Sequence, residues 1–151
     1  MKSQYMEPLP IPPASDADKS TLAALAEACQ SAAQERYTRQ QDITRRIPDL
    51  CPAGNDKVKR EKDGTPKLTN KLKSWWELED FAAFRTEVKK TFKTEIPLAE
   101  RSDWEDWIKK EKAEIDRLSA RIVRGEDEIN AIVYRLFDLS DEEIALLEAN
   151  I

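Results

Sequence analysis

The sequence contains no histidine, only three glycines and only two cysteines. Histidine is the commonest general base and the commonest metal ligand, so a catalytic site or a metal site in this chain would lack its usual residue. There is also no Gly-rich phosphate loop, no cysteine cluster with metal spacing and no serine in a nucleophile elbow. The sequence therefore predicts no catalytic residue and no metal site in this chain.

Long apolar runs are missing as well. No run approaches the roughly 20 residues that span a membrane, and the first residues lack the apolar core of a signal peptide. We therefore expect a cytoplasmic protein without a membrane partner. Cys29 falls in an alanine-rich helical pattern, which favours a reduced thiol in the role of a small hydrophobic residue over a disulfide with Cys51.

The composition favours an all-α fold. Charged residues make up 36% of the 151 residues, and Val, Ile and Thr seldom alternate with polar residues as they do in strands. Scarce glycine and abundant charge are typical of helices with long solvated faces. A chain of this length is one domain, or one domain with an appendage.

Residues 1–14 are predicted to form an extended, Pro-rich N-terminal strap or linker, because four prolines remove backbone donors and disfavour helix in the residues before them. A helical domain is expected over residues 15–151. Its first helix starts at a capping box of Ser15 and Asp18 and ends near Arg46, because Pro48 follows.

The longest predicted helix runs from about Ser102 to Phe137 and carries a coiled-coil-like apolar seam. The seam is interrupted at Glu111 and Gly125. A helix of about 35 residues is about 50 Å long, so it needs a long partner, and the first helix is the obvious one. The expected architecture is a long antiparallel helical hairpin with additional packed helices. The seam residues are Ile108, Ile115, Leu118, Ile122, Ile129, Ile132 and Leu136.

Two further helices are predicted from capping boxes. Ser74 with Glu77 starts one helix, which ends before Pro97, and Ser140 with Glu143 starts a tail helix. The apolar residues of the tail can fold back on the seam. Trp75 and Trp76 are adjacent and cannot both face one core, so the tryptophans either clamp the helix ends or offer an anchor to a partner.

A basic loop is predicted at about residues 48–73, because prolines, Gly54 and the Asp63-Gly64 turn exclude a regular element there. Scattered lysines suit contact with DNA phosphates, which sets affinity but reads no sequence. The alternative is a solvated flexible loop, and charge alone does not decide between the two. The candidate phosphate contacts are Lys57, Lys59, Arg60, Lys62, Lys67, Lys71 and Lys73.

Three stretches resemble one family. The stretch "EPLPIPPASDADK" at residues 7–19 resembles the junction after the target-recognition domain in bacterial N6-adenine DNA methyltransferases of restriction-modification systems, including the type IIG restriction enzymes. The stretch "INAIVYRLFDLSDEEIALLE" at residues 129–148 is similar to the C-terminal signature of that family. The block that begins "SWWELEDF" at Ser74 also resembles a subset of these methylases. The matching C-terminal residues are Val133, Tyr134, Leu136, Phe137, Leu139, Ser140, Glu142, Glu143 and Ile144.

The resemblance implies a role without catalysis. The S-adenosylmethionine loop and the Asn-Pro-Pro-Tyr motif of the family are absent here, so this chain holds no cofactor and S-adenosylmethionine belongs to a parent enzyme. The chain would be the C-terminal helical module of that enzyme. It would support target-DNA recognition by scaffolding and by non-specific phosphate contacts. Its partners would be double-stranded DNA and the methyltransferase and target-recognition domains.

A second hypothesis needs no nucleic acid. The seam between Ile115 and Leu136 could dimerise with a second copy, which would make the chain a coiled-coil protein–protein interaction module. The two hypotheses differ in their partner, and they are distinguished by binding to a duplex and by the oligomeric state.

Overall fold

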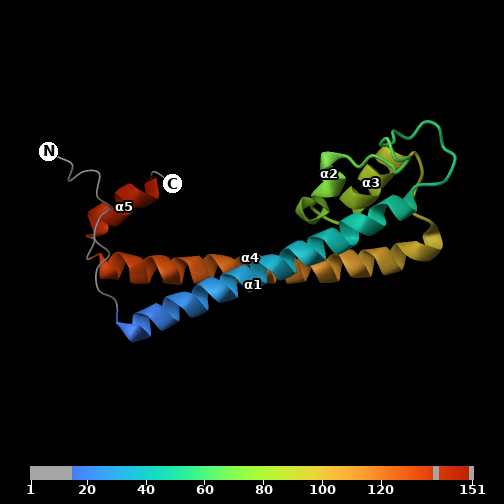
Figure 1. Cartoon of the computed structure of the whole chain (residues 1–151). Helices are drawn as coiled ribbons and strands as arrows, with labels where there is room; N and C mark the ends of the chain where they lie inside the picture. Colours follow the sequence, from blue (N-terminus) through green and yellow to red (C-terminus); the bar gives the residue numbers. More distant parts are fainter. Residues whose placement is uncertain (1–14, 138–139, 150–151) are drawn as a thin grey trace. The chain divides into compact units, whose positions relative to one another are not determined.

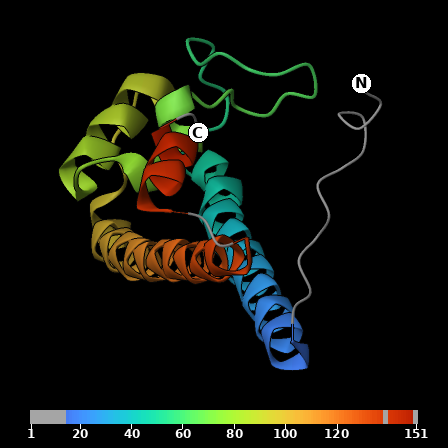
Figure 2. The ribbon, with the colours of Figure 1, turned by 90° about the vertical axis from the view of Figure 1, so that its left-hand side faces the viewer.

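The computed structural model describes residues 15–137 and 140–149, and within these ranges it contains helices and no β-strand (Figures 1 and 2). The prediction of an all-α fold is confirmed, whereas the predicted strap at residues 1–14 lies outside the described residues. The elements are α1 (Asp16–Arg46), η2 (Ile47–Leu50), α2 (Asn70–Lys73), η3 (Trp75–Glu77), α3 (Phe81–Phe92), α4 (Leu98–Leu136) and α5 (Asp141–Ala149).

The chain divides into two compact units. Unit 1 comprises Met1–Ser31 and Arg121–Ile151, and unit 2 comprises Ala32–Ala120. The long helices α1 and α4 each contribute one part to each unit. Within a unit the two parts pack together and run in opposite directions (Figure 1). The predicted pairing of two long helices is therefore present.

Unit 2 holds the main apolar core, to which every element of the unit contributes. Trp75 is fully buried in it, and its indole nitrogen donates a 3.0 Å hydrogen bond to the carbonyl of Gln40 in α1. Trp76 is half-buried and packs edge-on against Trp75, with ring centroids 5.7 Å apart. Both adjacent tryptophans therefore pack against the same core, and the prediction that they cannot both face it is wrong, because a 3₁₀ turn and an edge-on ring contact bring Trp76 to the margin of the core. The core residues are Ile43, Ile47, Leu50, Val58, Leu72, Trp75, Phe81, Phe84, Val88, Phe92, Ile96, Ile108 and Ile115.

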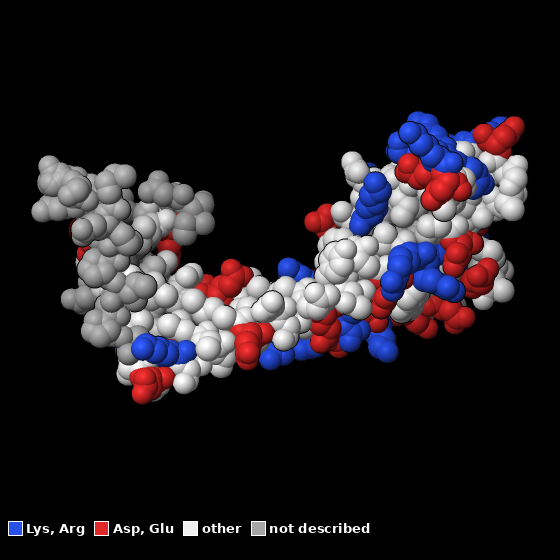
Figure 3. Space-filling model, viewed as in Figure 1, with Lys and Arg blue, Asp and Glu red and all other residues white. Residues whose placement is uncertain are grey.

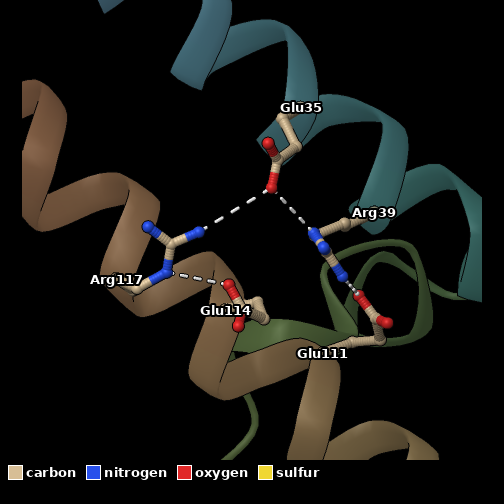
Figure 4. Close-up of polar contacts among 5 residues, drawn as sticks. All are labelled: Glu35, Arg39, Glu111, Glu114 and Arg117. Atoms are coloured by element: carbon tan, nitrogen blue, oxygen red, sulfur yellow. Dashed lines mark hydrogen bonds and ion pairs between the residues drawn. The ribbon is translucent and has the colours of Figure 1, made fainter.

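The interruption of the seam at Glu111 is explained by a polar network between α1 and α4 in unit 2 (Figure 4). Arg39 donates to Glu111 at 2.7 Å and to Glu35 at 3.2 Å. Arg117 lies 3.9 Å from Glu35 and donates to Glu114 at 2.8 Å. Glu111 first, and then Glu35, raises the pKa of the Arg39 guanidinium by hydrogen bonding. The buried carboxylate of Glu111 therefore has a positively charged partner on α1.

The interruption at Gly125 is explained by close packing in unit 1. A Cβ atom at this position would lie 2.4 Å from the Sγ atom of Cys29, so only glycine fits without a rearrangement. The Cys29 thiol lies 3.8 Å from the carbonyl of Ile122, to which it donates a weak hydrogen bond. Both cysteines are free thiols, as the sequence predicts.

Two predicted helix starts are confirmed. The backbone N–H of Asp18 donates to the hydroxyl of Ser15 at 3.0 Å, which caps α1. Ser140 and Glu143 form a reciprocal capping box at α5, with bonds of 3.1 and 3.2 Å. No side chain of α5 is buried among the described residues, and Leu147 is 48% exposed. The expected burial of the apolar side of the tail helix is therefore not seen.

Two predicted helix starts are wrong. Ser74 makes no capping hydrogen bond, and a 3₁₀ turn that places Trp75 in the core follows it. The helix proper, α3, begins after Asp80, whose carboxylate accepts from the N–H of Ala83 at 2.9 Å. The long helix α4 begins at Leu98 rather than at Ser102, because Pro97 starts the first turn: its carbonyl accepts a hydrogen bond from the N–H of Glu100 at 2.9 Å.

Candidate phosphate-binding site

The predicted basic loop is shorter than expected. Its ends form η2 and α2, so Lys71 and Lys73 lie on a helix and the loop itself covers residues 51–69. Within the loop the N–H of Lys67 donates to the carbonyl of Lys59 at 2.9 Å, and Val58 is buried in the core. Figure 2 shows this connection looping out from the helices of unit 2. The two sides of the loop are therefore bonded to each other, and Val58 anchors the loop to the core.

The turn of the loop is fixed by local side-chain bonds. Asp63 accepts hydrogen bonds from the hydroxyl and the N–H of Thr65, at 2.6 and 3.0 Å, and these bonds hold the pKa of the Asp63 carboxyl below its ordinary value. Gly64 has a positive φ of 91°, which suits glycine. Arg60 reaches the carbonyls of Gly64 and Pro52 at 3.0 and 3.4 Å. Arg60 thus stabilises the loop from within.

Three loop lysines and two lysines of the C-terminal end of α3 surround one cavity of about 330 Å³. We call this cavity the lysine pocket. Figure 3 shows a group of Lys and Arg side chains on this part of unit 2, with acidic side chains beside it. The residues that line the lysine pocket are Lys57, Lys59, Lys67, Leu68, Thr69, Lys90, Thr91 and Lys93.

None of the five lysines of the pocket forms an ion pair with a residue in the described part of the chain. Lys93 has a left-handed backbone conformation with φ of 60° at the end of α3, and its ammonium donates to the carbonyl of Lys90 at 3.0 Å. Uncompensated cations that converge on one cavity raise the local concentration of anions.

Two hydroxyl groups lie beside the lysines. Thr69 donates to the buried carboxylate of Glu87 at 2.8 Å, so its hydroxyl hydrogen is already engaged. The hydroxyl oxygen of Thr91 is buried and has no hydrogen-bond partner among the described residues. The pocket therefore combines five positive charges with one unsatisfied hydroxyl group, a combination that suits an oxyanion such as phosphate.

The structure brings together only some of the predicted contact residues. Lys57, Lys59 and Lys67 line the pocket, whereas Lys62, Lys71 and Lys73 are exposed outside it. Lys90 and Lys93 are not predicted as contact residues, because lysines at the C-terminal end of a helix are explained by the helix dipole alone. The described residues also contain no group of three or more Cys, Asp or Glu side chains that could hold a metal ion.

The predicted seam residues differ in burial between the units. Ile108, Ile115 and Leu118 are almost completely buried in unit 2. In unit 1 the remaining four, Ile122, Ile129, Ile132 and Leu136, are half-buried. None of the described helices is both long and apolar enough to cross a membrane.

Comparison with known proteins places most of the chain in one family. A family model described as a domain of unknown function (DUF8810) matches residues 15–133. No curated protein and no solved structure matches the chain.

Proposed function

We propose that the chain, which belongs to the DUF8810 family, is a non-catalytic helical module that contacts the phosphates of double-stranded DNA. The observation that carries this proposal is the lysine pocket, where five lysines without carboxylate partners converge. A lysine is a compact point charge that binds phosphate without reading bases. The pocket would therefore supply affinity and register, and the sequence specificity would come from another domain.

The resemblance of residues 7–19 and 129–148 suggests the parent of this module. We propose that it works in the cytoplasm with an N6-adenine DNA methyltransferase of a restriction-modification system. In this proposal the methyltransferase domain holds S-adenosylmethionine and a target-recognition domain reads the DNA. The role of the chain is to support the recognition domain and to fasten the complex to the DNA backbone.

Two matched triple variants test the proposal. Changing Lys57, Lys59 and Lys67 to Gln removes three charges from the pocket, and changing Lys62, Lys71 and Lys73 to Gln removes three charges outside it. In a titration with a random-sequence duplex at low salt, we expect the pocket variant to lose about tenfold or more in affinity. The control variant should lose clearly less. Equal losses, or no duplex binding by the unmodified chain, would contradict the proposal.

A second candidate function is dimerisation through the seam between Ile115 and Leu136. The observation that favours it is the half-buried state of Ile129, Ile132 and Leu136 in unit 1. The buried Ile115 and Leu118 of unit 2 argue against it, because they offer no free apolar surface to a second copy. Sedimentation at increasing protein concentration, with Ile129→Asp as the disrupting variant, tests this function. A monomer at high concentration would exclude it.

A further inference from the structure

Unit 2 carries a second group of cations at the connection between α3 and α4. Three cations surround the single carboxylate of Glu95, and we call these four residues the Glu95 cluster. Arg101 lies 3.2 Å from the carboxylate, Arg85 lies 3.7 Å from it and Lys89 lies 4.0 Å from it. Three positive charges against one negative charge leave the cluster with a net positive charge of two.

The three cations are held unequally. Arg101 donates to the carbonyl of Ile96 at 2.8 Å in addition to Glu95, so it fastens the connection between the helices. Arg85 makes no hydrogen bond within the described part of the chain, and its Nε atom is buried without a partner. An arginine has five N–H donors, so the hydrogen-bonding capacity of Arg85 is unused. Lys89 is mostly exposed and is held only by its loose ion pair.

A hollow of about 360 Å³ lies between these groups, lined by Ala82, Arg85, Thr86, Lys89 and Glu95. Thr86 donates its hydroxyl to the carbonyl of Ala82 at 2.9 Å and is already satisfied. The groups that remain available to a ligand in the hollow are therefore Arg85 and Lys89. Exposed ion pairs at 3.7 and 4.0 Å contribute little to the stability of the fold. Stabilisation of the fold therefore does not explain why Arg85 and Lys89 both line the hollow.

We infer that the Glu95 cluster is a second phosphate-binding site and that the carboxylate of Glu95 occupies the place of a phosphate oxygen in the free protein. The ligand class is a phosphodiester of the same nucleic acid that the lysine pocket binds, so this inference rests on the proposed function. Arginine matches a phosphate with two parallel hydrogen bonds, which a lysine pocket cannot offer. The cluster would thus fix the orientation of a strand that the lysine pocket attracts.

The helix geometry supports a common ligand. Lys89 belongs to the cluster and Lys90 to the lysine pocket, and consecutive residues of a helix point about 100° apart. The two sites therefore lie on neighbouring faces of α3, near its C-terminal end. A single duplex could contact both without any change in the fold of unit 2.

The removal of Glu95 tests the inference most sharply. In a duplex titration at low salt we expect Glu95→Gln to bind several-fold more tightly than the unmodified chain, because the competing carboxylate is gone. Glu105→Gln is the matched control, since it makes the same charge change in unit 2 and also releases a lysine, Lys109, from an ion pair. An equal effect of the two variants would overturn the inference.

The removal of the cations gives an independent readout. We expect the double variant Arg85→Gln, Lys89→Gln to lose about tenfold in duplex affinity and to show a shallower salt dependence. The control is Lys109→Gln, Lys110→Gln, which removes two exposed charges from α4. If the triple pocket variant loses affinity while the cluster variants behave as their controls, the inference fails and the proposed function stands. If the unmodified chain binds no duplex, both fail.

Discussion

At the scale of single residues, the two irregular positions of the seam have opposite causes. Glu111 is polar because Arg39 lies opposite it, and Gly125 is small because Cys29 lies opposite it. The sequence shows both interruptions, since they break an apolar period. It does not show their partners, because the pairing of α1 with α4 is needed to say which residues face each other.

The pair of Glu111 and Arg39 gives a prediction about stability. Glu111→Ala leaves the guanidinium of Arg39, which is 29% exposed, without its closest partner. We expect the free energy of unfolding to fall by about 2 kcal/mol, because a hydrogen bond between charged, partly buried groups is lost. Urea denaturation followed by circular dichroism measures this change.

Glu114→Ala is the control for that prediction. Glu114 also binds an arginine at 2.8 Å, but Arg117 is 54% exposed. An exposed pair contributes little to stability because water screens it, so the control should cost clearly less. Equal costs for the two variants would show that the pair of Glu111 and Arg39 has no special role.

Asp18 gives a prediction about pH. A hydrogen bond from Arg135 at 2.7 Å lowers the pKa of the Asp18 carboxyl below its ordinary value of 3.8. Because the folded pKa is depressed, the stabilisation by this pair is complete above the ordinary pKa and is lost as the pH falls through the lowered one. Carboxyl titration by NMR should show the low pKa, and Arg135→Gln should raise it. An unchanged pKa in this variant would mean that the pair does not form.

At the scale of helices, periodicity and capping differ in what they predict. The apolar period predicts both long helices, and the capping boxes at Ser15 and Ser140 are present. The same motif fails at Ser74, where burial of Trp75 and the better cap at Asp80 determine the start of α3. A Ser-x-x-Glu pattern permits a helix start, and tertiary packing decides whether the chain uses it.

Close packing of α1 and α4 in unit 1 gives a prediction about this helix pair. Gly125→Ala adds a methyl group 2.4 Å from the Cys29 sulfur. Overpacking of this kind costs about 1–3 kcal/mol, whereas alanine is favoured over glycine in a helix by about 1 kcal/mol. We therefore expect a net loss of stability.

The Cys29→Ala variant provides a background in which the same substitution should have the opposite effect on stability. With Cys29→Ala the obstructing sulfur is absent, so Gly125→Ala should now raise the free energy of unfolding by up to about 1 kcal/mol. A double-mutant cycle in urea measures the change of sign. The same effect of Gly125→Ala in both backgrounds would show that the helices do not approach each other closely at this position.

At the scale of the whole molecule, the fold class could be predicted from the sequence and most of the candidate site could not. Composition and periodicity are properties of the chain itself, so they give the all-α fold and the helix pair. The lysine pocket needs the loop to be anchored beside the C-terminal end of α3, which is distant in sequence. Lys90 and Lys93 therefore line the pocket together with the loop lysines. Arg60 does not line the pocket, because it donates to the carbonyl of Gly64 within the loop.

The salt dependence of duplex binding by the unmodified chain tests the central claim most directly. A protein that neutralises phosphates releases counterions, so log K falls linearly with log salt, with a slope of about −0.9 for each phosphate contacted. Three to five lysine contacts predict a slope of roughly −2.7 to −4.5. The triple pocket variant should have a shallower slope than the triple control variant. Binding that is absent at low salt, or that does not respond to salt, would contradict a phosphate-contacting role.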